Sequence, residues 1–335
     1  MDTMSSLTTI TDDNMDTLES YDYKKIIEYI KERLNTAPKV SLSGYTTNLE
    51  IFDLKDSDDC DLFVQIAKED LRETPETVAQ SIKELKELLA GEPDLHIFDS
   101  DEFYTIFLRP CKWYAQSALL LIKGYFRFFQ NYSLVKGLIP SKNKLGFYSG
   151  LVYPLPLRGK EGCRIFIIEL GKQWNPKKVS LNDIFKTLVL CQLAAIMEPK
   201  TQISGGRTIL DFNGLSLSQV TYYSPSFAKM VVDYVQKALP VRIRSIHIVN
   251  QPIIFNIVFA MFKPLLQEKI RKRIHFHGTD RESLMTFIDK SVLLKKYGGE
   301  LDVPDESYSR DLWKHFCAFD PLFEVLDKIG YTDKK

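Results

Sequence analysis

Residues 245–278 read SIHIVNQPIIFNIVFAMFKPLLQEKIRKRIHFHG, and three kinds of segment follow one another in this stretch. It begins with alternating side chains, so that Ile246 and Ile248 share one face, as in a β-strand. Residues 253–262 come next, and Asn256 is the one polar residue among them. An apolar segment of this length predicts a helix, with Pro252 in its first turn and Asn250 as its cap.

The end of the stretch is strongly basic, because Lys263, Lys269, Arg271, Lys272 and Arg273 are opposed by Glu268 alone. A helix that is apolar nearly all round is either fully buried or exposed to water only part of the time. Cations directly after it favour a helix in a membrane interface, with the charges at headgroup level. The alternatives are a buried core helix and a solvated charged face with incidental ion pairs.

The bulk composition excludes several classes of protein. Among 335 residues, 44 Lys and Arg balance 44 Asp and Glu, so binding to nucleic acid has no support from net charge. The five cysteines are scattered and form no pair at zinc spacing, which favours reduced thiols in the cytosol. The acidic N-terminus is not a secretory signal, and no apolar run approaches the roughly 20 residues of a membrane span.

The first part of the chain predicts a helical bundle. Apolar residues at helical spacing, with Thr74 as an N-cap and Pro75 at the first helical position, indicate helices over residues 21–34, 61–72, 75–90, 99–108 and 114–130. Residues 1–20 are Ser/Thr/Asp-rich and are expected to be disordered, and residues 35–59 are expected to be a linker.

A different pattern begins near Pro140. Runs of β-branched and aromatic residues predict strands over residues 164–170, 207–212, 242–249 and 274–277. Helical patterns lie between them, over residues 180–197, 216–223 and 225–238, the first with Ser180 and Asp183 as a capping box. Alternation of strand and helix predicts an α/β fold with a sheet built from βαβ units. The aromatic tail after residue 301 is expected to pack back on the body.

The ordered set of motifs resembles the CRAL-TRIO (Sec14-like) lipid-binding family, in the branch of α-tocopherol transfer protein and retinaldehyde-binding protein. The motifs are DLRETPE (70–76), FLRPCKW (107–113), ILDFNGLSLSQV (209–220), the opening stretch, KRIHFHG (272–278) and KKYGGEL (295–301). The resemblance implies an N-terminal helical domain at residues 60–138 and a CRAL-TRIO domain at 139–301, a mixed β-sheet with flanking helices and a lid helix over a hydrophobic cavity. Residues 1–59 would be a flexible extension and linker, and 302–335 a C-terminal extension.

The sequence departs from the family where relatives usually read FLRARKF, because Pro110 and Cys111 stand there. A basic side chain is therefore missing, which weakens any headgroup contact from the helical domain. The resemblance otherwise implies one hydrophobic ligand, exchange of that ligand at membranes and, in many members, recognition of phosphoinositide headgroups.

The candidate ligand pocket comes from helix faces and from the resemblance. Phe185, Leu188, Val189 and Gln192 stand at i, i+3, i+4 and i+7 and share one helix face. Gln192 is a candidate to orient a hydroxyl or aldehyde group of the ligand, although a glutamine bonded to the backbone is the alternative. The resemblance places further pocket walls at Leu210, Tyr223, Val231, Val235 and Ile246, for each of which ordinary core is the alternative.

The lid is predicted to consist of Ile253, Ile254, Ile257, Val258, Phe259, Met261 and Phe262. Converging cations could hold an inositol phosphate, since arginine offers bidentate contacts. The phosphoinositide and membrane candidates are Arg242, Arg244, Lys263, Lys269, Arg271 and Arg273, and the resemblance favours Arg242, Lys269 and Arg273.

We see no nucleophile paired with a base and no nucleotide-binding motif, so an enzyme is not expected. His275 and His277 alternate on a strand, but no third metal ligand is visible, so neither a metal nor a cofactor besides the lipid is expected. The predicted function is a cytoplasmic lipid-transfer or chaperone protein that binds one tocopherol- or retinoid-like molecule and associates peripherally with phosphoinositide membranes. The alternative is a phosphoinositide-binding adaptor of membrane traffic whose pocket is vestigial or constitutively filled.

Overall fold

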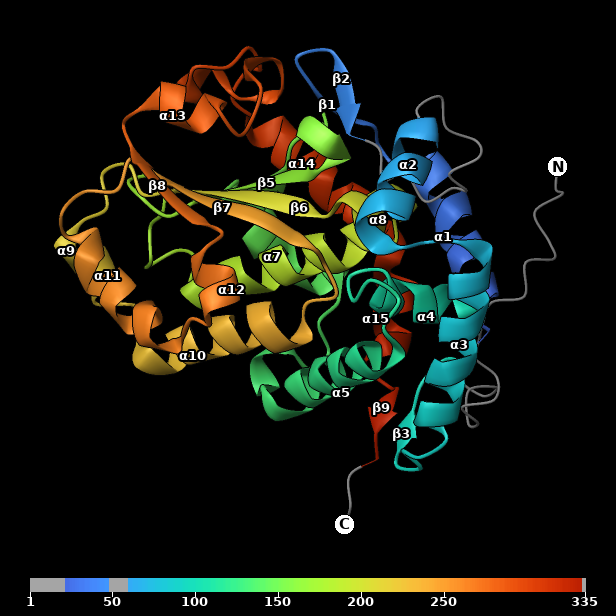
Figure 1. Ribbon diagram of the computed structural model, residues 1–335. Helices are drawn as coiled ribbons and strands as arrows, with labels where there is room; N and C mark the ends of the chain where they lie inside the picture. Colours follow the sequence, from blue (N-terminus) through green and yellow to red (C-terminus); the bar gives the residue numbers. More distant parts are fainter. Residues whose placement is uncertain (1–21, 48–59, 333–335) are drawn as a thin grey trace, which may run out of the picture.

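A five-stranded sheet lies at the centre of the computed structural model, which describes residues 22–47 and 60–332 (Figure 1). The strands follow one another across the sheet in chain order: β4 (Val152–Pro154), β5 (Arg164–Glu169), β6 (Gly206–Asp211), β7 (Ile243–Val249) and β8 (Ile274–Gly278). β4 is antiparallel to β5, and the other neighbours are parallel. The predicted α/β class with a mixed sheet is therefore confirmed.

Helices in the crossovers cover one face of this sheet. The connections between parallel strands contain α7 (Leu181–Ala195), α8 (Pro199–Ser204), α9 (Leu217–Val220), α10 (Pro225–Asp233) with a π-helical turn at Tyr234–Ala238, α11 (Phe255–Phe262) and α12 (Glu268–Arg271). Each parallel strand is added at the same edge, and right-handed crossovers then place their helices on the same face. Figure 1 shows α7, α10, α11 and α12 on that side, with α13 (Arg281–Met285) on the other.

The predicted helical bundle is present, and its capping follows the sequence. It contains α2 (Cys60–Leu71), α3 (Pro75–Leu89), α4 (Asp101–Leu108) and α5 (Ala115–Asn131). The Thr74 side chain accepts a hydrogen bond from the Thr77 amide at the start of α3. Ser180 and Asp183 form the predicted capping box at the start of α7.

The helix predicted over residues 21–34 is present, but the expectation of a linker is wrong for residues 40–47. Residues 23–47 form α1 (Tyr23–Thr36) and an antiparallel hairpin of β1 (Val40–Leu42) and β2 (Tyr45–Thr47). The segment buries apolar side chains, since Ile30 and Val40 are fully buried, and the Tyr23 hydroxyl lies 3.4 Å from the Met197 sulfur. Residues 1–21 and 48–59, for which disorder and a linker were predicted, lie outside the described residues.

The C-terminal tail packs against the body, as predicted. It forms α14 (Glu306–Phe316), α15 (Asp320–Leu326) and β9 (Gly330–Tyr331), which pairs with β3 (Leu95–His96). Phe316, Phe319 and Leu322 are buried, and α1 packs against α15. One hydrophobic core runs from Tyr23 to Ile329, so the helical bundle, the sheet domain and the tail share it.

Candidate functional site

A cavity of about 180 Å³ lies between the sheet and the helices on its covered face. Ile246 and Ile248 of β7 point into it because alternate residues of a strand share a face. Its lining side chains are Leu, Ile, Val and Phe, with the single exception of Tyr223. Such a wall removes hydrocarbon from water and offers few specific polar contacts, which suits a lipid.

Seven of the nine predicted pocket residues line this cavity: Phe185, Leu188, Leu210, Tyr223, Val231, Val235 and Ile246. Val189 and Gln192 do not. The face that α7 turns to the cavity consists of Leu181, Ile184, Phe185 and Leu188, so it begins one turn before the predicted set. Gln192 lies one turn beyond Leu188, and Val189 is fully buried in the core.

Buried polar atoms without hydrogen-bond partners occur on α7, just before α10 and in the π-helical turn. Gln192 Oε1, Tyr223 Oη and Tyr234 Oη have no hydrogen-bond partner among the described residues. Burial raises the pKa of Tyr223, so its hydroxyl remains a protonated donor at neutral pH. An unpaired buried polar group costs about 1–3 kcal/mol, which a ligand group could offset. Sequence reasoning identified Gln192, but no periodicity distinguishes a paired tyrosine hydroxyl from an unpaired one.

The lid helix begins at Phe255, later than predicted, and Asn250 does not cap it. Asn250 has a φ of 55°, and its side chain donates to Asp211 and accepts from Arg281. Ile253 and Ile254 form the turn that leads into α11. The predicted helix therefore starts one turn later because Asn250 is held by the ends of β6 and α13 instead.

α11 has an inner and an outer apolar face. Val258, Phe259 and Phe262 line the cavity, and Met261 is partly buried. Ile253 is 89% exposed and Ile257 is 48% exposed, so these two point to solvent. The outer face is extended by residues that the sequence analysis missed, because α9 packs against α11 and its Leu217 is 63% exposed.

Lys269 and Arg273 line a cleft of about 910 Å³ between α5, the π-helical turn and α12. Four further cations line it, namely Lys123, Arg127, Lys229 and Lys237, against the carboxylate of Asp233. Burial raises the pKa of Asp233, but hydrogen bonds from Lys229, Lys237 and Tyr132 outweigh it and bring the value to about 2. Cys111 is part of the same wall.

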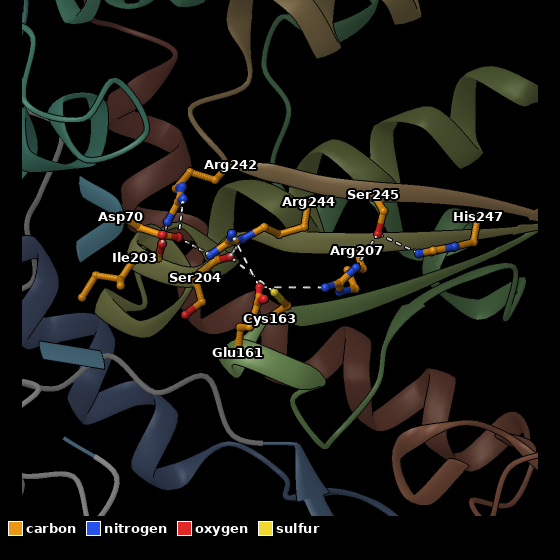
Figure 2. A network of polar contacts seen from close by, with 10 residues as sticks. All are labelled: Asp70, Glu161, Cys163, Ile203, Ser204, Arg207, Arg242, Arg244, Ser245 and His247. Carbon is orange, nitrogen blue, oxygen red and sulfur yellow. Dashed lines mark hydrogen bonds and ion pairs between the residues drawn. The ribbon is translucent and has the colours of Figure 1, made fainter. Parts of the chain in front are cut away.

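Arg242 and Arg244 do not line this cleft, so the six predicted cations do not form one patch. Both arginines donate to Asp70 of α2 at 2.9 Å, as Figure 2 shows. Arg271 donates to the Leu266 carbonyl, and Lys263 is exposed after the lid. Of the six predicted cations, two thus pair with a carboxylate of the helical bundle, two line the cleft and two lie on the surface beside α11. These pairs are Arg242 with Arg244, Lys269 with Arg273, and Lys263 with Arg271.

His247 and His277 form a hydrogen-bonded chain on the face of the sheet that α13 covers. His247 lies 2.9 Å from His277, which lies 2.8 Å from the Ser283 hydroxyl. No group of His, Cys, Asp or Glu within residues 22–47 and 60–332 has the arrangement of a metal site. Asp211 accepts a hydrogen bond from the Tyr297 hydroxyl and is buried, in agreement with a structural role.

Comparisons with known proteins place this geometry in a family. The CRAL/TRIO domain matches residues 148–299, which contain the sheet, the cavity and the lid. A protein named alpha-tocopherol transfer protein-like from Homo sapiens is 34% identical over 276 residues, which cover 79% of this chain and 80% of that protein. The mouse protein of the same name is 33% identical, with 78% of each chain covered.

Clavesin-2 from Rattus norvegicus is 28% identical over 268 residues, covering 77% of this chain and 80% of that protein. Within the described residues, none of the helices is both long enough and apolar enough to span a bilayer.

Proposed function

This chain belongs to the CRAL/TRIO family of lipid-binding and lipid-transfer proteins, and from that membership we propose that it carries one isoprenoid-like lipid, of tocopherol or retinoid type, beneath α11. It exchanges this lipid at membranes that contain phosphoinositides, as a cytoplasmic protein with peripheral membrane association. The observation that carries the proposal is the hydrocarbon cavity whose roof, α11, has a second apolar face turned to solvent.

The size of the cavity supports a moving lid. Its volume of about 180 Å³ is smaller than the roughly 300–1,000 Å³ of typical ligand pockets. A long isoprenoid therefore requires α11 to move outward. A bilayer lowers the cost of this movement, because the lid's inner face then contacts a second apolar phase. Each CH₂ group kept out of water contributes about 0.8 kcal/mol, so a lipid that crossed water unaided would move very slowly.

The polar end of the ligand is proposed to lie at the end of α7. When the cavity expands beyond Leu188, it reaches Gln192, whose Oε1 lacks a partner in the structure. The Tyr223 hydroxyl, on a residue that already lines the cavity, is a second unpaired group. A ligand with one hydroxyl or carbonyl group would pair with one of them, which favours an isoprenoid alcohol or aldehyde over a pure hydrocarbon.

The headgroup is proposed to bind in the basic cleft. Lys269 is exposed and Arg273 is half-buried, and both line a cleft with four further cations, of which Lys229 and Lys237 pair with Asp233 and Lys123 pairs with Glu92. Phosphate oxygens pair well with such groups, Arg offering bidentate contacts. Because α12 and the lid follow each other in the chain, a headgroup in the cleft would lie close to the apolar segment that meets the bilayer.

Two measurements on the purified full chain test this function. Native mass spectrometry followed by extraction should find one lipid per protein molecule, and the protein should move that lipid between vesicles faster when the acceptor contains phosphoinositide. A protein that binds phosphoinositide vesicles but does not move a lipid between them, whether its pocket is empty or constitutively filled, would be the membrane-traffic adaptor instead. A transfer rate that does not depend on phosphoinositide in the acceptor vesicles would contradict headgroup binding but would still support lipid carriage.

A further inference from the structure

Three arginine side chains gather at the ends of β6 and β7 nearest to α2: Arg207, Arg242 and Arg244, here called the arginine cluster (Figure 2). Their side chains are 11%, 12% and 20% exposed. Each is held on its inner side by an uncharged acceptor. Arg207 donates to the Ser245 hydroxyl at 2.8 Å, Arg244 to the Ser204 carbonyl at 2.9 Å and Arg242 to the Ile203 carbonyl.

The carboxylates of this cluster lie on its outer, solvent-facing side. Asp70 is 42% exposed and accepts from both Arg242 and Arg244 at 2.9 Å. Glu161 is 54% exposed and lies 3.5 Å from Arg244 and 3.9 Å from Arg207. Three cations thus face two carboxylates, and Arg207 Nε is buried with no hydrogen-bond partner among the described residues. The arginines are fixed, and the carboxylates are the part that can move.

We propose that Asp70 is an intramolecular competitor for phosphate, so that a phosphomonoester of an inositol lipid headgroup binds Arg242 and Arg244 when the Asp70 carboxylate has left them. This inference rests on the proposed function, which supplies the phosphoinositide membrane, and it adds a second phosphate site that is separate from the basic cleft of Lys269 and Arg273. Arg242 and Arg244 then form a phosphate site that the Asp70 carboxylate of the helical bundle occupies until the headgroup phosphate displaces it.

Exchange of the Asp70 carboxylate for a phosphate requires little rearrangement of the protein. Asp70 stands at the end of α2, and a rotation of its side chain places the carboxylate in water, so the charge of Asp70 itself is not left buried. The guanidinium groups of Arg242 and Arg244 lose their shared carboxylate, and the arriving phosphate takes its place. α2 itself stays docked, because Phe63 and Leu71 on the same helix are fully buried. The arginines need no reorganisation, since backbone carbonyls keep both guanidinium groups in place.

The competition also selects the anion. Arg242 and Arg244 repel each other and need a shared anion, which Asp70 supplies with a single negative charge. A phosphomonoester carries about −1.5 to −2 at neutral pH and three acceptor oxygens, so it outcompetes one carboxylate. A lipid such as phosphatidylserine offers no phosphomonoester. Asp70 therefore sets a threshold that separates phosphoinositides from other anionic lipids.

The test compares Asp70→Asn with Glu69→Gln in vesicle binding. Glu69 is exposed on the same helix and bonds to Gln65, so its substitution changes the charge equally without touching the arginine cluster. With vesicles of phosphatidylcholine and phosphatidylinositol bisphosphate, Asp70→Asn should bind about three- to tenfold tighter than the natural chain. Glu69→Gln, and either variant on phosphatidylserine vesicles, should change binding less than twofold. Calorimetry with soluble inositol trisphosphate should show the same gain for Asp70→Asn.

Several results would overturn the inference. Asp70→Asn with unchanged or weaker affinity and an unchanged melting temperature would show that Asp70 does not compete. An equal gain for Glu69→Gln would indicate bulk charge, and a gain on vesicles but not with inositol trisphosphate would indicate the membrane surface. In an Arg242→Gln/Arg244→Gln background the effect of Asp70→Asn should vanish, which keeps the test valid if the single variant melts earlier. Lipid extraction and transfer, measured in parallel, report on the carrier function independently.

Discussion

Nδ1 of His247 on β7 and Nε2 of His277 on β8 lie 2.9 Å apart, at hydrogen-bonding distance. The chain continues on both sides, from the Ser245 hydroxyl 2.7 Å from His247 Nε2 to the Ser283 hydroxyl at His277. A contact between two ring nitrogens needs one donor and one acceptor, so the two rings cannot both be fully protonated. The chain joins β7, which leads into the lid, to β8 and α13.

The hydrogen-bonded series of His247 and His277 predicts that the protein loses stability in mild acid. Burial, with the nearby His277, His275 and Arg207, lowers the pKa of His247 from 6.5 to about 3. The unfolded chain therefore binds a proton below pH 6.5 that the folded chain does not. The stabilisation is present above pH 6.5 and is lost as pH falls toward 3, about 2 kcal/mol of it by pH 5.

Thermal unfolding measured between pH 8 and pH 5 checks this prediction. The melting temperature should fall with pH, and His247→Gln should flatten that dependence. His96→Gln, on the separate β3–β9 ribbon, is the matched control and should leave the slope unchanged. A natural chain whose melting temperature is constant over this range would contradict the prediction.

The outer face of the lid should determine transfer and not stability. Ile253 and Ile257 are exposed, so replacing both by Asp should leave the melting temperature nearly unchanged. Charges at these positions resist insertion into a bilayer, and the vesicle transfer rate should fall by roughly tenfold or more. Leu62→Asp/Val64→Asp on α2, where both apolar side chains are also exposed, is the control. Equal losses for both pairs would mean that α11 is not the contacting element.

Two buried glutamines should respond to the same substitution with opposite signs. Gln192 Oε1 lacks a partner, so Gln192→Leu should raise the free energy of unfolding of the unliganded protein by about 1 kcal/mol. Gln202 donates to the Ile196 carbonyl and accepts from Arg109, so Gln202→Leu should lower it by about 1–3 kcal/mol. Urea unfolding measures both. Gln192→Leu should also weaken binding of an isoprenoid alcohol relative to its hydrocarbon.

Neighbouring lysines on one short segment test the cleft. Lys269 lines the cleft, whereas Lys272 is exposed and pairs with Glu268. Lys269→Gln should weaken binding to phosphoinositide vesicles several-fold and reduce its salt dependence, because a phosphate contact is lost. Lys272→Gln should have a much smaller effect. Cosedimentation at two salt concentrations distinguishes them, and similar losses would reduce the cleft to a non-specific basic surface.

Much of the fold could be predicted because its elements follow local patterns. Alternation fixed the inward face of β7 at Ile246 and Ile248, and the Ser180–Asp183 pair marked the start of α7. The lid's apolar character followed from residues 253–262 alone. The start of the lid was predicted a turn early because Asn250, a good cap by residue type, is held by Asp211 and Arg281.

By itself, the sequence determined the order of strands and helices, the hydrocarbon wall and the supply of cations, because periodicity and residue type act over a few residues. The tertiary structure decided which cations are available. Arg242 and Arg244 look equivalent to Lys269 in sequence, yet they are bound by Asp70, more than 170 positions earlier in the chain. The pairing of a charge depends on which distant segment folds beside it, and no local spacing records that contact.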